Sequence, residues 1–496
     1  MASGLGISLF MILMGFLTRK LFVDNIGVEY LGLNGLLQNI LGVTSLLEGG
    51  FATSVIYNMY KPLAENDQPR ILALLQLYKK VYRYIALGIF LFALLLYPFI
   101  GNFIQDADSL EYVSVVYFIF VFNSLIGYFS AYKWSLINAA QKNYKLTYIT
   151  LAYQLSLYLA RIPILLYTQN YIVYLLCDSV LCLIMNYAVI KKADALFPYV
   201  KTKEKYQVEP SVKANIVQNM KYIFIINIGT YLMHSTDNII ISSFVGITIV
   251  GLYSNYTLIT SVINTMVRQI LNSFADSMGD LVASESSERV YDVYKTIFFV
   301  NFLTVSIPCI ILYNTLSPFV AWWLGEEYQM SMVVVDLMLF NFYIMQMRES
   351  AITLKGKSGI FHPDRYTTML QGAINVVLSL VLVKLWGLAG VLLGTGLSVL
   401  AVGFWQYPRI CYKYIFKKPL WFYFRQYAIY TIVAVSALLI SIFACKFVTL
   451  NNPLLLTVAN GIISVLCIMA VYFLCFKHTP QYQSLLTYVL NIIHRK

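Results

Sequence analysis

The sequence predicts an all-α integral membrane protein with about 14 transmembrane helices. Three observations support this fold class: long apolar stretches along the whole chain, basic residues confined to alternate gaps between them, and a short motif that occurs twice. Together they predict two parallel-repeat six-helix lobes around a central cavity, with two further helices at the end. The expected spans are 4–23, 33–57, 84–104, 113–131, 146–166, 172–190, 222–244, 247–266, 297–316, 332–351, 369–385, 388–407, 427–447 and 454–476.

The distribution of charge sets the expected orientation. Thirty of the 35 Lys and Arg residues fall in, or at the edge of, alternate gaps or in the C-terminal tail. Basic residues resist translocation, so these gaps are assigned to the cytoplasm. Both termini are then cytoplasmic, and the outer gaps are too short for an external domain. The first apolar stretch lacks the basic start and the cleavage site of a signal peptide.

The repeated motif divides the chain. Gly27 and Gly32 precede the second span, and Gly246 and Gly251 precede the eighth, at a constant offset of 219 residues. Six spans separate the copies, so the halves run in the same sense. The expected organisation is an N-lobe (1–191), a basic cytoplasmic linker (192–221), a C-lobe (222–410), and two appended spans with a cytoplasmic tail (411–496).

Composition excludes several classes of protein. Charged residues make up only 12% of the chain, well below a soluble domain. The net charge of +12 is dispersed over the cytoplasmic gaps, which favours contact with anionic membrane lipid rather than nucleic acid. The seven Cys form no C-x-x-C pair, so no metal site is expected. The motifs of P-loop ATPases, serine hydrolases and zinc proteases are absent, and we expect a transporter rather than an enzyme.

Charged side chains within apolar spans are costly and need a reason. Arg161 and Asp178 lie on consecutive antiparallel spans, and we expect a structural intramembrane pair. Glu48 precedes two glycines, where a structural role and substrate binding are both open. Arg19 and Lys20, near the outer end of the first span, either snorkel to the interface or bind a phosphorylated head group.

The polar run from His234 to Asn238 interrupts the seventh span. Asp237 is expected to face a water-filled cavity, with Asn238 contributing to substrate binding. At i and i+3, His234 and Asp237 would share a face of a regular helix. This pair either carries a coupling ion, H+ or Na+, or His234 only orients Asp237. No other cofactor is expected.

Several stretches resemble the polysaccharide-exporter family, the O-antigen and capsule repeat-unit flippases of the multidrug/oligosaccharidyl-lipid/polysaccharide exporter superfamily. They occur in order, from near the start to about residue 400. The stretches are Gly27 to Leu36, Tyr57 with Tyr60 to Ala64, Leu77 to Lys80, Ser235 to Ser242, Val250 to Tyr256, Asp364 to Tyr366, and Gly387 to Gly390 with Gly394 and Thr395.

The resemblance implies alternating access and a substrate of sugars on an undecaprenyl pyrophosphate carrier, in the bacterial cytoplasmic membrane. It also implies that spans 1, 2, 7 and 8 line the cavity, which would place Arg19, Glu48 and Asp237 near the path. Polysaccharide polymerases and glycosyltransferases are expected partners. Two alternatives stay open: a cation-coupled multidrug exporter of the same superfamily, and a membrane polysaccharide polymerase or ligase. Basic residues near the cavity argue against the first, and the short outer gaps against the second.

Overall fold

A computed structural model describes residues 2–48, 50–105, 110–360, 362–364 and 366–494. Helices dominate this part of the chain, and it contains no β-strand. Packing divides the chain into two compact units, Met1–Gly251 and Leu252–Lys496, called the N-unit and the C-unit below. Gly49 and Arg365, which belong to patterns noted in the sequence, lie outside the described residues.

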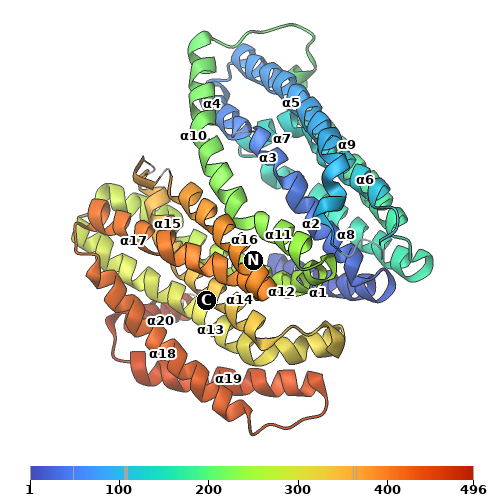
Figure 1. Cartoon of the computed structure of the whole chain (residues 1–496). Helices are drawn as coiled ribbons and strands as arrows, with labels where there is room; N and C mark the ends of the chain where they lie inside the picture. Colours follow the sequence, from blue (N-terminus) through green and yellow to red (C-terminus); the bar gives the residue numbers. More distant parts are fainter. Residues whose placement is uncertain (1, 49, 106–109, 361, 365, 495–496) are drawn as a thin grey trace. The chain divides into compact units, whose positions relative to one another are not determined.

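The N-unit is built from helices that run from α1 to the start of α12, coloured blue to green in Figure 1. Several helices begin where the sequence supplies a cap: Asp67 accepts a hydrogen bond from the Arg70 amide at α5, and Asn170 accepts two at α9. The helices are α1 (Ala2–Asn25), α2 (Val28–Gly42), α3 (Thr44–Glu48), α4 (Phe51–Ala64), α5 (Gln68–Leu96), α6 (Val113–Ile126), α7 (Ala131–Ala139), α8 (Thr147–Pro163), α9 (Tyr171–Leu196), α10 (Pro210–His234) and α11 (Thr236–Phe244).

Three of the expected spans are interrupted in the N-unit. The second consists of α2, α3 and α4, and Gly50 precedes α4 with a φ of 73°. A Cβ at Gly50 would lie 2.3 Å from the side chain of Ile223 in α10, so only glycine allows this approach. The fourth span bends by 46° between Val113–Phe129 and Ala131–Ala139, and the seventh breaks between α10 and α11. These breaks free backbone polar groups at membrane depth, which must be satisfied within the protein.

The repeated motif forms a reciprocal contact within the N-unit. Gly27 and Gly246 both have positive φ angles, 106° and 132°, immediately before α2 and α12. A Cβ at Gly32 would lie 2.0 Å from the Ile247 carbonyl oxygen, and a Cβ at Gly251 would lie 2.1 Å from that of Val28. The offset that relates the two glycines also relates Val28 to Ile247. The motif therefore encodes a local two-fold contact between α2 and the start of α12.

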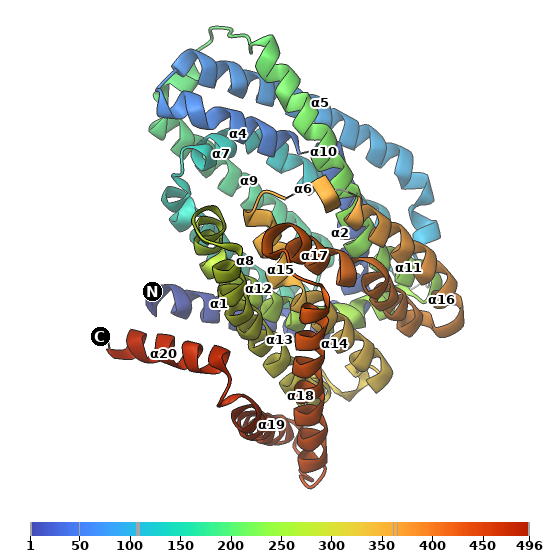
Figure 2. The ribbon, with the colours of Figure 1, turned by 90° about the vertical axis from the view of Figure 1, so that its left-hand side faces the viewer.

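The C-unit contains the remainder of α12 (Ile247–Ser284), α13 (Ser287–Trp323), α14 (Met332–Met347), α15 (Glu349–Lys357), α16 (Thr367–Ser398), α17 (Phe404–Ile410), α18 (Trp421–Cys445), α19 (Pro453–Phe476) and α20 (Pro480–His494). Helices α18 and α19 pack against each other and against α13, as Figure 2 shows. Their core is aromatic: the Phe302 and Tyr430 rings stack 4.6 Å apart, and Tyr472 and Phe476 lie against Phe302. The expected thirteenth and fourteenth spans are thus part of one core with α13.

Helix α16 is a hairpin of two helices rather than one long helix. Its backbone is not helical at Trp386 and Gly387, where Gly387 has a φ of 54°. Beyond the turn, a Cβ at Gly390 would lie 2.1 Å from the Leu382 carbonyl oxygen. Asn375 donates a hydrogen bond to the Thr395 hydroxyl (2.9 Å) across the hairpin. This turn falls where the sequence predicts the gap between spans 11 and 12.

The fold class predicted from the sequence is confirmed: the protein is an all-α, multi-pass membrane protein. Seven described helices are long and apolar enough to cross a membrane, or eight if the bent pair is one span. One of the seven, Thr367–Phe416, includes the α16 hairpin and so corresponds to both expected spans 11 and 12. The interrupted second and seventh spans are not among the seven, and neither are expected spans 1, 8 and 10. By contrast, α12 continues 18 residues past the expected end of span 8, so much of the gap before span 9 is helical.

The predicted lobes are defined by the order of the spans and by the repeated motif. The two units, by contrast, are defined by which helices pack together. Helices α10 and α11 carry the expected seventh span, and they pack against α2, α3 and α4 within the N-unit. The lobe boundary at residues 192–221 therefore stays a prediction.

Candidate functional site

A polar cavity of about 440 Å³ lies inside the N-unit, among α2, α6, α8 and α9. We call it the N-unit polar cavity, and its polar lining residues are Asn34, Gln38, Asn123, Ser124, Tyr153, Arg161 and Asp178. Amide, hydroxyl and charged groups in this number are unusual within apolar spans. They line part of an open cavity that can hold water or the hydroxyl groups of a ligand.

An ion pair forms one wall of the N-unit polar cavity. Arg161 donates to both carboxylate oxygens of Asp178, from Nε to Oδ1 (2.9 Å) and from Nη2 to Oδ2 (2.8 Å). The guanidinium also lies 5.0 Å from the ring centroid of Tyr174. Bidentate geometry offsets the cost of removing two charges from water. The structure thus brings together the two residues that the sequence pairs, and their structural role stays a prediction.

Arg19 and Lys20 are adjacent in α1 but have different surroundings. Lys20 forms an exposed ion pair with Asp24 (3.5 Å), one turn later in the same helix. Arg19 is half-buried and lies near Tyr174, whose ring also contacts Arg161. Two cations therefore converge on Tyr174, and Arg19 is the better placed of the pair for a role inside the N-unit.

Glu48 lies at the end of α3 and is held by two tyrosines from other elements. Tyr128 donates to Oε1 (2.5 Å) and Tyr82 donates to Oε2 (3.1 Å). Phe51 and Tyr78 pack against Tyr82, so aromatic rings surround this carboxylate. Among the described residues, Glu48 has no basic partner within ion-pair distance. The arrangement accepts protons or cations more readily than anions.

The polar run of the expected seventh span lies at a helix break. Helix α10 ends at His234, and α11 begins at Thr236 after Ser235. His234 is exposed, and Asp237 is half-buried in the first turn of α11, where the helix dipole favours a carboxylate. Because the two residues lie on either side of the break, regular helical spacing does not place them on one face. Asn238 follows in α11 with its amide near Gly35 of α2.

The C-unit contains an apolar cavity of about 510 Å³ between α13, α14, α17 and α18. Tyr313 and Asp336 supply part of its small polar surface, and most of its wall is aliphatic or aromatic. We call it the C-unit apolar cavity. It is lined by Ser306, Cys309, Ile310, Tyr313, Asp336, Leu339, Phe340, Tyr343, Ile344, Leu400, Phe404, Tyr427, Thr431, Ala434, Val435 and Leu438.

A buried arginine in the C-unit was not among the predicted site residues. Arg348 is 6% exposed, donates to the Gln371 side chain (3.0 Å), and lies 5.3 Å from the Tyr407 ring centroid. A Cβ at Gly403 would lie 1.9 Å from this guanidinium, so the π-helical turn that ends at Gly403 makes room for it. The sequence places Arg348 at the end of an expected span. At such a position the sequence alone does not distinguish a buried side chain from an exposed one.

Sequence reasoning also missed the uncharged residues of the N-unit polar cavity. Asn34 and Gln38 are four residues apart in α2, and the Gln38 amide donates to Asn34 (2.6 Å). Polar residues at this spacing share a helix face, and within an apolar span that pattern is itself a signal. Asn123 and Ser124 are adjacent in α6 and give no such pattern.

No family model and no curated protein matches the sequence. Solved structures do match it, and they place the chain among the folds of transporters of the MOP superfamily. One is a structure described as the lipid II flippase MurJ in an inward closed conformation. It has a TM-score of 0.66 and 13% identity, covering 95% of this chain and 98% of that one.

Two other similar structures are MATE transporters. An inward-facing MATE-family multidrug resistance transporter matches with a TM-score of 0.59 and 11% identity, over 81% of this chain and 94% of that one. The Vibrio cholerae MATE transporter VcmN matches with a TM-score of 0.53 and 13% identity, over 83% and 94%. At these identities the likeness concerns the fold, which hosts both lipid flipping and drug export.

Proposed function

We propose that this protein flips undecaprenyl-pyrophosphate-linked oligosaccharide repeat units from the cytoplasmic to the outer leaflet of the bacterial cytoplasmic membrane. The product would serve capsule, O-antigen or exopolysaccharide synthesis. The mechanism is alternating access, without covalent change to the substrate. Glycosyltransferases would supply the substrate and a polysaccharide polymerase would consume it.

The C-unit apolar cavity is the observation that carries this proposal. An isoprenoid carrier needs an apolar surface along its path, because its chain stays in hydrocarbon while the head group crosses. The cavity offers about 510 Å³ with an almost wholly apolar wall, and one side of that wall is α18, one of the two appended helices. A small water-soluble drug would not need such a surface.

The N-unit supplies groups suited to the head group. Arg19 is the residue that we assign to the pyrophosphate or to an acidic sugar, with Lys20 as support, because guanidinium groups bind phosphate oxygens in bidentate fashion. The N-unit polar cavity offers amides and hydroxyls for sugars. Asp237, with His234, is proposed to couple transport to H+ or Na+, and Glu48 and Asn238 are proposed to line the substrate path.

The extent of the structural matches also supports a flippase. The lipid II flippase structure covers 95% of this chain, whereas the two MATE structures cover 81% and 83%. The match includes 94% of each MATE structure, so the lower coverage of this chain means that the MATE structures lack parts of it.

Flipping of fluorescent undecaprenyl-pyrophosphate oligosaccharide in proteoliposomes tests the proposal. Purified protein should move the lipid between leaflets without ATP, and Arg19→Ala should slow this movement at least tenfold. The charge-preserving Arg19→Lys should be milder, and Lys446→Ala in the C-unit is a matched loss of one charge. Equal rates for the wild type and Arg19→Ala would refute the assignment of Arg19.

A cation-coupled multidrug exporter is the second candidate, and the surroundings of Glu48 favour it. A carboxylate ringed by Phe51, Tyr78, Tyr82 and Tyr128 is suited to an organic cation. The same proteoliposomes distinguish the candidates, since a drug exporter would move ethidium in exchange for H+ or Na+ and leave the lipid in place. A polymerase or ligase would instead change the lipid covalently.

A further inference from the structure

A second concentration of charge lies outside the N-unit polar cavity, where α5, α7 and α9 pack together. Lys133 of α7 is 8% exposed and forms an ion pair with Asp194 of α9. The ammonium groups of Lys133 and of Lys79 in α5 lie 5.9 Å and 5.5 Å from the centroid of the Tyr132 ring. Arg83, one turn beyond Lys79, is close enough to repel it, as is Lys133. We call Lys79, Arg83 and Lys133 the basic cluster.

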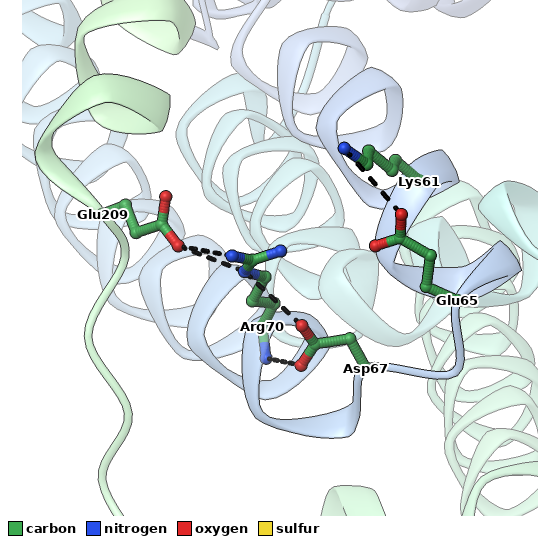
Figure 3. Close-up of polar contacts among 5 residues, drawn as sticks. All are labelled: Lys61, Glu65, Asp67, Arg70 and Glu209. Atoms are coloured by element: carbon green, nitrogen blue, oxygen red, sulfur yellow. Dashed lines mark hydrogen bonds and ion pairs between the residues drawn. The ribbon is translucent and has the colours of Figure 1, made fainter.

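The basic cluster is short of negative charge. Among the described residues, Asp194 is the one carboxylate within ion-pair distance of any of its three cations, which leaves an excess of two positive charges. The start of the same helix is different, as Figure 3 shows: Arg70 has both Asp67 (3.4 Å) and Glu209 (3.0 Å) beside it. Lys61 is paired with Glu65 (3.8 Å) in the same view. Cations gathered without partners raise the free energy of the folded state unless an anion joins them.

The position of the basic cluster indicates what that anion is. Lys79 and Arg83 come just before the expected span 84–104, and Lys133 comes just after the expected span 113–131. All three therefore lie at the predicted cytoplasmic surface of the membrane, at the depth of lipid phosphates. Basic residues that only set the membrane topology can be dispersed and exposed. Here Lys133 is buried, while Lys79 and Arg83 are exposed, and the Tyr132 ring lies close by.

We propose that the basic cluster binds the phosphate of a lipid head group in the cytoplasmic leaflet. Lys79 and Arg83 contact the phosphate oxygens, and Lys133 supplies charge from below while Asp194 holds it in place. The phosphate belongs either to a bulk anionic phospholipid or to a lipid-linked pyrophosphate. The inference concerns binding alone and does not depend on transport.

The test uses the full-length protein in phosphatidylcholine nanodiscs. Phosphatidylglycerol and undecaprenyl pyrophosphate are titrated separately, and bound lipid is measured by native mass spectrometry. The variant Lys79→Gln/Arg83→Gln should weaken binding of at least one probe by roughly tenfold or more. The probe that is affected identifies the source of the phosphate. Lys79→Arg/Arg83→Lys keeps both charges and should bind as the wild type does.

The matched control is Lys413→Gln/Lys477→Gln, which removes two charges from the C-unit. Both lysines lie over aromatic rings, at 5.2 Å and 5.7 Å, as Lys79 does. Binding of either probe to this control should stay within twofold of the wild type. Wild-type affinity of the cluster variant for both probes, or an equal loss in the control, would overturn the inference. A protein that binds the probe at the basic cluster but does not flip lipid would uphold it and refute the proposed function.

Discussion

At the scale of single residues, the structure shows which charged side chains of the apolar spans meet one another. Arg161 and Asp178 meet in a bidentate pair, and Arg161 also lies over the ring of Tyr174, which is close to Arg19. Charged residues could be identified in the sequence because they are rare in apolar spans. The partner of a charged residue could be predicted only when the two lay on consecutive helices. The tyrosines at Glu48 come from elements 34 and 80 residues away, and nothing local marks them.

The Arg161–Asp178 pair gives a prediction on stability. Arg161→Met leaves Asp178 charged and alone within the membrane, which should cost about 3–5 kcal/mol. Arg161→Met/Asp178→Leu removes both charges and should recover most of that loss. Thermal unfolding of the detergent-solubilised variants measures both effects. If the double variant is as unstable as the single one, the pair is not what stabilises these helices; if it is stable but inactive, the pair has a transport role.

Asp237 gives a prediction on transport. Asp237→Asn keeps the shape of the side chain and removes its charge at the start of α11, so the protein should insert normally and export less. Display of surface polysaccharide in cells, set against the amount of protein in the membrane, measures this. Thr236→Ser is a neighbouring control that keeps the hydroxyl. Normal display with Asp237→Asn would remove Asp237 from the site.

At the scale of helices, the interruptions explain what the sequence could and could not predict. Both ends of α19, the start of α9 and the end of α18 lie within two residues of the predicted span ends. Helix α9 ends six residues later, and α18 begins six residues earlier, than the predicted spans. The turn inside α16 was predicted because Gly387 follows a complete span. The breaks within the second and seventh spans fall at polar or glycine-containing stretches, after Glu48 and at Ser235. A structural role for Glu48 was one of two open interpretations, whereas the polar run from His234 was interpreted as part of a continuous helix, because the packing of other helices sets the break. The extension of α12 was missed because hydropathy reports membrane crossing rather than helix length.

The contact between α2 and α12 gives a prediction at this scale. Gly32→Ala or Gly251→Ala places a methyl group about 2 Å from a carbonyl oxygen, so the two helices must separate. Transport should fall, and disulfide formation in Val28→Cys/Ile247→Cys should slow when either change is added. Gly88→Ala is the matched control, since a Cβ there would meet no atom within 4 Å. Unaltered cross-linking would show that the contact tolerates a side chain.

At the scale of the whole molecule, the fold is similar to that of solved transporter structures, and the chemistry of its two cavities differs. The N-unit polar cavity suits hydrated groups and the C-unit apolar cavity suits hydrocarbon. Composition and charge alone predicted an all-α membrane protein, because the membrane determines both which residues its spans contain and where basic residues lie. It could not predict the cavities, since they depend on which faces of the helices meet.

The proposed substrate gives a prediction on energetics. A doubly anionic pyrophosphate that leaves a negative interior gains up to about 4–5 kcal/mol at 100 mV. Outward flipping should therefore accelerate when a potassium–valinomycin potential makes the liposome side equivalent to the cytoplasm negative. Reversing the potential should slow it. Rates that ignore the potential and both the proton and sodium gradients would leave only movement down the gradient of the lipid itself.

The reciprocal glycine contact has a consequence for how such a chain can arise. Gly32 touches the carbonyl of Ile247, and Gly251 touches that of Val28, so each copy of the motif recognises the other copy. This is the geometry of an isologous interface, in which one surface patch pairs with itself across a two-fold axis. A half-length protein with a single copy of the motif would already present the surface needed to form a homodimer. Gene duplication and fusion of such a protein would be one route to a single chain with two copies of the motif at a constant offset of 219 residues.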